Sequence, residues 1–512
     1  MEGKKLYLIG IDAAPLWILD RLSSMKGMGG FDLFRERGLL APLESVLPPM
    51  TGPSWPTMYT GLDPGESGIP DFFYLDRDYT KQLAYFDQKK TPPFWDVLSG
   101  KGMKSLVITP AMVVRPDAGR DVDLMTGWPL PPKFSSKRVK EAAKMAGFEG
   151  EPQIEGKMKS GEIKMAEASR IYSESIRQRA EMAKSMMEGK GYDMAFICFT
   201  ETDRVQHYTL NSDWERHLYP LYREISSFIS WVGKYAADRG GDYAVMLVSD
   251  HGAQPIREKF LLNSWMINKG YASLASPGTS HPGTAVAEKT AAEKSRALYA
   301  IRERLISSGR LRGIYDKMPH RVKHAVRSAV RKVSSPPLSG DFTRIHDFDL
   351  DMRNTRAFAS VSNLVVGTIW INDRRFSKAT VPLSSKKALK AKLTGELKRI
   401  RTREGKRLVK NVFDGDDYYK GTKLFIAPDL LVEAEEGYTM DIFNYSKTSD
   451  FMPPELAKSG DHTRYGVFGI FGKGVGLKPF ERAEMNVRNI GPTALRYLGV
   501  APSRKAAPRS IL

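Results

Sequence analysis

The chain has 512 residues, 41% of them hydrophobic and 10% aromatic, a composition typical of a globular protein with two domains or with one domain and large insertions. Its formal net charge of +19 favours anionic partners such as phosphorylated metabolites, nucleic acid or an acidic membrane surface, although a generally basic proteome would produce the same balance. The single cysteine, Cys198, excludes internal disulfides and favours a cytoplasmic protein, and no run of about 18 apolar residues predicts a transmembrane helix.

The first predicted element is a strand at residues 6–11, a short apolar run that ends at Asp12. The preceding Lys4 and Lys5 imitate the start of a signal peptide, but Asp12 interrupts the apolar region and no small-residue cleavage site follows. A carboxylate at a strand end is a candidate ligand, and a helix-capping role is the alternative.

A proline-rich segment, residues 47–57, surrounds Thr51. Pro53 and Pro56 suit the first turn of a helix. A hydroxyl at a helix N-terminus faces unpaired N–H groups and the positive end of the helix dipole, where phosphate binds well. Thr51 is therefore a candidate phosphate-contacting residue, or simply a helix N-cap.

Asp203 and His207 stand four residues apart, directly after a strand predicted at residues 192–200. On a helix this spacing places both side chains on one face, as in a bidentate metal clamp, whereas a solvent-exposed pair is the alternative. The neighbouring elements are a strand at 104–109, a long helix at 213–238 and two amphipathic helices at 136–147 and 166–189, which we expect to be surface insertions.

The motif Ser249-Asp250-His251-Gly252 follows an apolar strand predicted at residues 243–247. Open α/β sheets bind their ligands at the C-terminal ends of the strands. A carboxylate beside an imidazole at such an end is half of a metal site, although the same residues also occur in ordinary turns.

The composition changes after Leu261, and residues 281–344 are predicted to be a basic helical insertion. Its helical region at 296–333 carries an apolar stripe flanked by arginine and lysine, which would suit an anionic membrane surface, a phosphate-rich partner, or packing of the stripe on the core. Residues 345–440 are predicted to form a small α+β cap, with strands at 357–362, 366–371 and 424–433 and a helix at 386–402.

The C-terminal part contains His462 just before a predicted strand, and a last helix is predicted to begin near Asn489. The basic tail from Ser503 is expected to be loose. These elements divide the chain into a catalytic α/β core at 1–280 and 441–512, the basic insertion at 281–344 and the cap at 345–440.

Seven side chains are thus candidate ligands: Asp12, Thr51, Asp203, His207, Asp250, His251 and His462. Oxygen and imidazole ligands in this number suit two divalent metal ions, most often zinc, with manganese or iron as alternatives. Two neighbouring ions hold the attacking and leaving oxygens of an in-line displacement at phosphorus.

The order of these motifs resembles the alkaline phosphatase superfamily, and its type I phosphodiesterase/nucleotide pyrophosphatase family in particular. The motifs are the strand-end Asp, Thr-x-Pro, Asp-x-x-x-His, Ser-Asp-His-Gly and a late Gly-x-His, and they extend from residue 6 to about residue 500. The resemblance implies an alkaline-phosphatase-like α/β core, in which a mostly parallel central sheet is flanked by helices.

The resemblance also implies a role for each candidate residue. Asp12, Thr51, Asp250 and His251 would hold one metal ion, and Asp203, His207 and His462 would hold the other. Thr51 would be the nucleophile that attacks phosphorus, and hydrolysis of the resulting phosphothreonine would complete the reaction.

The sequence does not define the substrate, because it departs from the family's motifs at two positions near the nucleophile. Phe72 stands where nucleotide pyrophosphatases carry an asparagine, and Ser67 stands where many relatives carry a histidine. A nucleotide, a nucleotide-sugar or a lipid-linked phosphate would each suit a hydrolase of phosphodiester or pyrophosphate bonds. The alternatives are a phosphotransferase acting on a lipid or sugar hydroxyl, and a non-catalytic protein that binds anionic lipid or nucleic acid through residues 296–333.

Overall fold

The computed structural model describes residues 3–84, 86, 91–117, 119–275, 342–344, 349–361, 365–421, 424–454, 458–476 and 485–502. The helical region predicted at 296–333 and the tail from Ser503 lie outside these residues, as does nearly all of the insertion predicted at 281–344. Among the helices within the described ranges, none has the length and apolar character needed to cross a bilayer.

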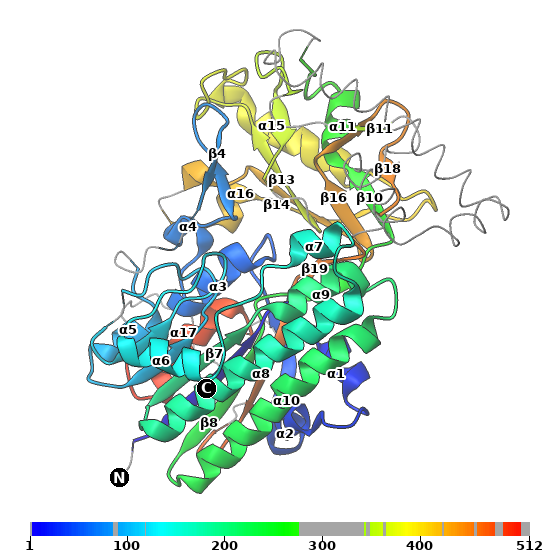
Figure 1. Ribbon diagram of the computed structural model, residues 1–512. Coiled ribbons are helices and arrows are strands. Elements are labelled where there is room, and N and C mark those ends of the chain that lie inside the picture. Colours follow the sequence, from blue (N-terminus) through cyan, green and yellow to red (C-terminus); the bar gives the residue numbers. More distant parts are fainter. Residues whose placement is uncertain are drawn as a thin grey trace, which may run out of the picture.

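A seven-stranded sheet forms the centre of the larger lobe (Figure 1). Its strands are, in spatial order, β2 (Gly38–Glu44), β20 (Tyr465–Phe471), β8 (Tyr243–Val248), β1 (Lys5–Ile11), β7 (Met194–Phe199), β5 (Ser105–Ile108) and β6 (Val122–Met125). The five strands β8, β1, β7, β5 and β6 are parallel to one another, and β20 runs antiparallel to both β8 and β2. The mostly parallel central sheet is therefore confirmed.

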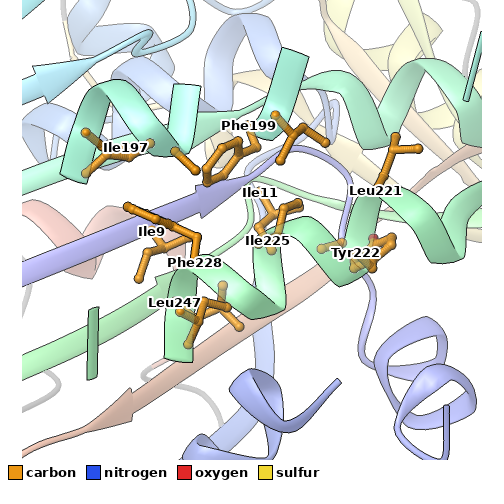
Figure 2. Close-up of a cluster of buried hydrophobic side chains, with 14 of the residues drawn as sticks. Ile9, Ile11, Ile197, Phe199, Leu221, Tyr222, Ile225, Phe228 and Leu247 are labelled. Carbon is orange, nitrogen blue, oxygen red and sulfur yellow. The ribbon is translucent and has the colours of Figure 1, made fainter. Parts of the chain in front are cut away.

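Helices cover both faces of this sheet because successive side chains of a strand point to opposite sides. On one face, Ile9 and Ile11 of β1 pack with Ile225 and Phe228 of α10, and Figure 2 shows these side chains meeting between strand and helix. The helices that share this core include α1 (Leu16–Leu22), α2 (Gly29–Arg37), α6 (Lys137–Met145), α8 (Met165–Gly189) and α10 (Trp214–Asp238).

The opposite face of the sheet carries a second core, to which Leu6 and Leu8 of β1 contribute. Its helices are α3 (Thr51–Thr60), α5 (Phe94–Ser99) and α17 (Ile490–Tyr497). One expectation is wrong here: α6 and α8 are not surface insertions, since buried residues of both helices pack in the first core.

A smaller antiparallel sheet lies in the upper lobe of Figure 1 and has a core of its own. Its strands are β12 (Ala357–Ala359), β13 (Val366–Ile371), β15 (Leu430–Ala434) and β14 (Val409–Asp414), with α15 (Leu383–Leu397) against them. Elements outside residues 345–440 also belong here: β10 (Glu258–Leu261) and α11 (Leu262–Asn268) share this core, and β18 (Phe451–Met452) pairs with β10. Strand β17 (Asn444–Ser446), which contacts α11, pairs with β11 (Phe342–Arg344). Strand β16 (Tyr438–Asp441) joins β10 in parallel.

Two strands differ from the sequence prediction because of proline. The strand predicted at 424–433 begins only at Leu430, after the 3₁₀ turn Leu424–Ile426, since Pro428 cannot donate a ladder hydrogen bond. Strand β2 contains Pro42 and was not predicted, but it lies at the edge of the central sheet, where a missing N–H is tolerated.

Candidate active site at the ends of the parallel strands

Three neighbouring parallel strands, β8, β1 and β7, end at the same edge of the sheet. Asp12 continues β1, and its backbone N–H donates to the carbonyl oxygen of Phe199 at the end of β7 (2.8 Å). Ala13 then takes a left-handed conformation, φ +57°, and its N–H donates to Asp250 Oδ1 after β8 (3.2 Å). These backbone contacts hold the carboxylates of Asp12 and Asp250 beside each other.

Thr51 reaches Asp12 from the first turn of α3. Its Oγ1 lies 3.3 Å from each carboxylate oxygen of Asp12, and the side chain is 6% exposed. The helix caps are elsewhere: Met50 precedes α3, Pro15 precedes α1, and neither helix has a side-chain cap. The capping alternatives for Thr51 and Asp12 are therefore wrong.

Asp203 and His207 lie on α9 (Glu201–Thr209), so the segment after β7 is helical as the spacing required. His207 Nε2 lies 3.4 Å from Asp203 Oδ1, and the two side chains are 21% and 19% exposed. Both are thus mostly shielded from water, and the alternative of a solvent-exposed pair is wrong.

His462 enters the site on a two-stranded ribbon formed by β9 (Gly252–Pro255) and β19 (Gly460–Thr463). In this antiparallel pair His462 lies opposite Ala253, two residues after His251. Its ring stacks on that of His251 with centroids 3.9 Å apart, and its Nε2 is 3.2 Å from His207 Nε2. Together with the contacts of Asp12 to Thr51 and of His251 to Asp250, this brings all seven candidate side chains into one cluster.

All three histidines are oriented in the same way, by a backbone carbonyl. Nδ1 of His207 bonds to Gly460 O (3.0 Å), Nδ1 of His251 to Gly252 O (3.0 Å), and Nδ1 of His462 to Pro49 O (2.9 Å). Because a carbonyl oxygen only accepts, Nδ1 carries the proton in each ring and the Nε2 lone pair of a neutral ring faces the cluster. Metal-binding histidines have this arrangement, in which a second partner fixes the tautomer.

Two groups of side chains are close enough to hold cations. Ligand atoms of Asp203, His207 and His462 lie within 4.8 Å of one another, and so do those of Asp12, Asp203 and His251. Asp250 Oδ2 and His251 Nε2 are 3.2 Å apart and buried, yet within the described part of the chain neither atom forms a hydrogen bond. Buried polar atoms without partners are costly, so the residues present fit two divalent ions.

The charges of the cluster favour the same conclusion. Burial raises the pKa of both the Asp12 and the Asp250 carboxyl, and the neighbouring carboxylates raise each further. Burial also lowers the pKa of His251, and the nearby His462 adds to this, so its ring is neutral. Cations would offset the repulsion between the carboxylates, while neutral imidazole is the form that binds metal.

Several supporting residues were not predicted. Trp55 Nε1 donates to Asp12 Oδ2 (3.3 Å), and Thr202 Oγ1 donates to the Asp12 carbonyl oxygen (2.6 Å). Ser249 Oγ accepts from the Ala14 N–H (2.8 Å) and donates to His251 O (2.7 Å). Of these residues, only Trp55 could have been found from the sequence, because it stands four residues after Thr51 and therefore on the same face of α3.

Solved structures with the same fold include phosphonoacetate hydrolase from Sinorhizobium meliloti 1021 in complex with phosphonoformate, at 12% identity and a TM-score of 0.56, covering 96% of this chain and 95% of that one. Murine ectonucleotide pyrophosphatase/phosphodiesterase 5 aligns at 12% identity over 98% of this chain and 97% of its own, with a TM-score of 0.47. A search among curated proteins found no match.

The fold and the family comparison define a hydrolase of the phosphodiesterase and pyrophosphatase type within the alkaline phosphatase superfamily. The sequence profile of the type I phosphodiesterase/nucleotide pyrophosphatase family matches residues 6–462. This range covers most of the chain, and the protein belongs to that family.

Proposed function

We propose that the protein is a two-metal hydrolase that cleaves phosphodiester or pyrophosphate bonds through a phosphothreonine intermediate. The observation that carries the proposal is the meeting of His207 Nε2 and His462 Nε2, 3.2 Å apart, with Asp203 Oδ1 within 3.4 Å of both. Two imidazole nitrogens and a carboxylate oxygen that converge at these distances are a ligand set typical of a divalent metal ion. Three imidazoles in the full set favour zinc over manganese or iron.

Asp203, His207 and His462 would hold one ion, and Asp12, Thr51, Asp250 and His251 the other. When bound, such ions supply Lewis-acid stabilisation to the attacking and leaving oxygens of a displacement at phosphorus. These assignments rest on the tautomers fixed by the carbonyl groups and on the unpaired buried atoms of Asp250 and His251.

Thr51 has the position of a nucleophile. Asp12 orients its hydroxyl, and the first turn of α3 directs the Gly52 N–H and the positive end of the helix dipole toward an incoming phosphoryl group. The bond from Thr51 Oγ1 to phosphorus forms as the bond to the leaving oxygen breaks, and the leaving group takes up a proton. Water then cleaves the phosphothreonine and regenerates the hydroxyl.

The substrate is proposed to be a phosphorylated small molecule, either a nucleotide, a nucleotide-sugar or a lipid-linked phosphate. Product analysis in the presence of an added alcohol separates the hydrolase from the phosphotransferase alternative. A hydrolase transfers the phosphoryl group to water, whereas a phosphotransferase transfers it to the alcohol. Cytoplasmic localisation and a membrane contact through residues 296–333 stay predictions.

Removal of metal is expected to abolish activity. Dialysis against a chelator should stop hydrolysis of bis(p-nitrophenyl) phosphate, and added zinc or manganese should restore it, because the charged cluster needs cations to bind an anionic substrate. Metal content and turnover are measured on the same samples. Full turnover in protein freed of metal would contradict the proposal.

Replacing His462 with alanine is expected to lower bound zinc from about two ions per chain to about one, since a three-residue site loses one of its ligands. His217→Ala on α10 is the matched control, because its ring contacts Ser169 Oγ (3.4 Å) away from the cluster, and it should keep both ions. Elemental analysis of the purified proteins gives the stoichiometry. Equal zinc in the two variants would remove His462 from the ligand set.

A further inference from the structure

An apolar pocket of about 540 Å³ opens beside the candidate active site. It lies between the hairpin of β3 (Phe73–Leu75) and β4 (Lys81–Leu83) and two loops, residues 112–115 and 128–133. Pockets of this volume accommodate most of a drug-sized ligand. The proposed mechanism makes no use of it.

Two contacts connect the pocket to the cluster. The Phe72 ring packs against Gly52, the residue after Thr51, so closely that a Cβ at Gly52 would lie 3.0 Å from its Cδ1. Trp128 meets Phe72 edge to face at 5.4 Å, and the guanidinium of Arg204, next to Asp203, lies 5.5 Å from the Trp128 ring. The aromatic wall of the pocket is therefore immediately beside the proposed nucleophile and one proposed metal ligand.

The pocket exposes hydrophobic surface that a soluble protein normally buries. Phe73, Leu83 and Leu130 all line it, and they are 40%, 48% and 47% exposed. Contiguous exposed apolar side chains of this kind mark a binding surface. Bound apolar groups would cover them.

The other side chains that line the pocket indicate which chemical class of ligand it can bind. Among the described lining residues only Arg115 and Lys133 are charged, both are cationic, and none is an amide or a carboxylate. A nucleobase would find the indole N–H of Trp128 as its one neutral donor in this described lining and no amide or hydroxyl side chain to accept from its edge, whereas an apolar chain needs neither. The two cations at the rim suit the negative charge that accompanies a phosphodiester.

We propose that this pocket binds the apolar chain, alkyl, acyl or prenyl, of an anionic amphiphilic phosphodiester. The inference rests on the proposed function, because it places the phosphoryl group of the same molecule at Thr51. It adds the substrate class, a lipid-type phosphodiester, and assigns recognition of its chain to Phe72, Leu83 and Leu130.

The test is a binding series that needs no turnover. Zinc-loaded wild-type protein is titrated by calorimetry with methyl-, butyl- and octylphosphonate at concentrations where each is monomeric. Each buried methylene contributes about fourfold to affinity, so octylphosphonate should bind at least about 100-fold more tightly than methylphosphonate. A ratio below about threefold would overturn the proposal.

Variants locate the effect. Leu83→Glu combined with Leu130→Glu should lower the octyl-to-methyl ratio at least about tenfold, because charged side chains then line the pocket. Leu383→Glu is the matched control, since Leu383 is 49% exposed on α15 outside the pocket, and it should keep the wild-type ratio. An unchanged octyl-to-methyl ratio in the double variant would overturn the proposal. It would also be overturned if adenosine monophosphate bound the wild-type protein more tightly than octylphosphonate and lost that affinity in the double variant.

Hydrolysis separates this inference from the proposed function. If the wild-type protein cleaves p-nitrophenyl methyl phosphate but its affinity for alkylphosphonates does not rise with chain length, the proposed function stands and the pocket assignment is wrong. If the protein binds octylphosphonate in the pocket but cleaves no phosphodiester with any added metal, the pocket assignment stands and the proposed function is wrong.

Discussion

Replacing Thr51 with alanine should lower kcat for an aryl phosphodiester by at least about 10⁴-fold and leave the zinc content near its wild-type value. The loss is large because the hydroxyl that forms the covalent intermediate is gone and only binding and charge stabilisation remain. The metal should stay because Asp12, Asp250 and His251 are still present. Folding should change little, since alanine is favourable in a helix and the lost hydrogen bond contributes about 1 kcal/mol.

Thr60→Ala is the matched control for this variant. Thr60 ends the same helix, where its Oγ1 donates to Pro56 O (2.7 Å), and its loss should change kcat less than about threefold. Acid quenching of wild-type turnover, followed by mass spectrometry, should locate phosphate on Thr51. Retention of more than about 1% of wild-type kcat in Thr51→Ala, with zinc bound, would remove Thr51 from the nucleophilic role.

Part of the candidate site could be predicted because the C-terminal ends of parallel strands lie at the same edge of the sheet. Asp12, Asp250 and His251 each follow a recognisable apolar strand, and β1 and β8 are neighbours in the sheet. His462 was a candidate because it precedes a predicted strand, but only the family resemblance assigned it to a particular metal ion. Its place depends on the pairing of β19 with β9, about 200 residues earlier, and short antiparallel ribbons leave a weak pattern in sequence.

The supporting contacts were beyond sequence reasoning for a similar reason. Ser249 connects the Ala14 N–H, in the loop after β1, with the His251 carbonyl, and Phe72 packs on Gly52; neither contact leaves a periodic pattern in the sequence. The sequence did show that Phe72 departs from the asparagine of nucleotide pyrophosphatases. The structure gives that departure a location, in the wall of the apolar pocket.

The charged pattern of residues 166–189 gave no sign that this helix carries a buried ion pair near the site. Arg179 of α8 is fully buried, its Nη2 donates to Glu201 Oε1 (2.7 Å) and its Nη1 to Cys198 O (2.5 Å). Glu201 is the first residue of α9, the helix that carries Asp203 and His207, and it also accepts from Ser175 Oγ (2.8 Å). The pair therefore connects the core under the sheet to the helix that presents two proposed metal ligands.

Arg179→Met is expected to destabilise the protein by about 3–5 kcal/mol, because it leaves the Glu201 carboxylate buried without its cation. Arg177→Met is the matched control on the same helix, since its ion pair with Glu174 is half exposed and should change stability by less than about 1 kcal/mol. Urea unfolding followed by circular dichroism measures both. Equal midpoints for the two variants would contradict the assigned role of the buried pair.

The pH dependence of that variant tests the cause of the instability. Burial raises the pKa of Glu201, and Arg179 opposes this, so losing the arginine should raise the pKa further. A carboxyl whose pKa is higher in the folded than in the unfolded state costs stability as pH rises through that interval, and the cost disappears at lower pH. The deficit of Arg179→Met relative to wild type should therefore shrink as pH falls from about 8 to about 5. A deficit that stays constant over this range would assign the loss to packing rather than to the stranded charge.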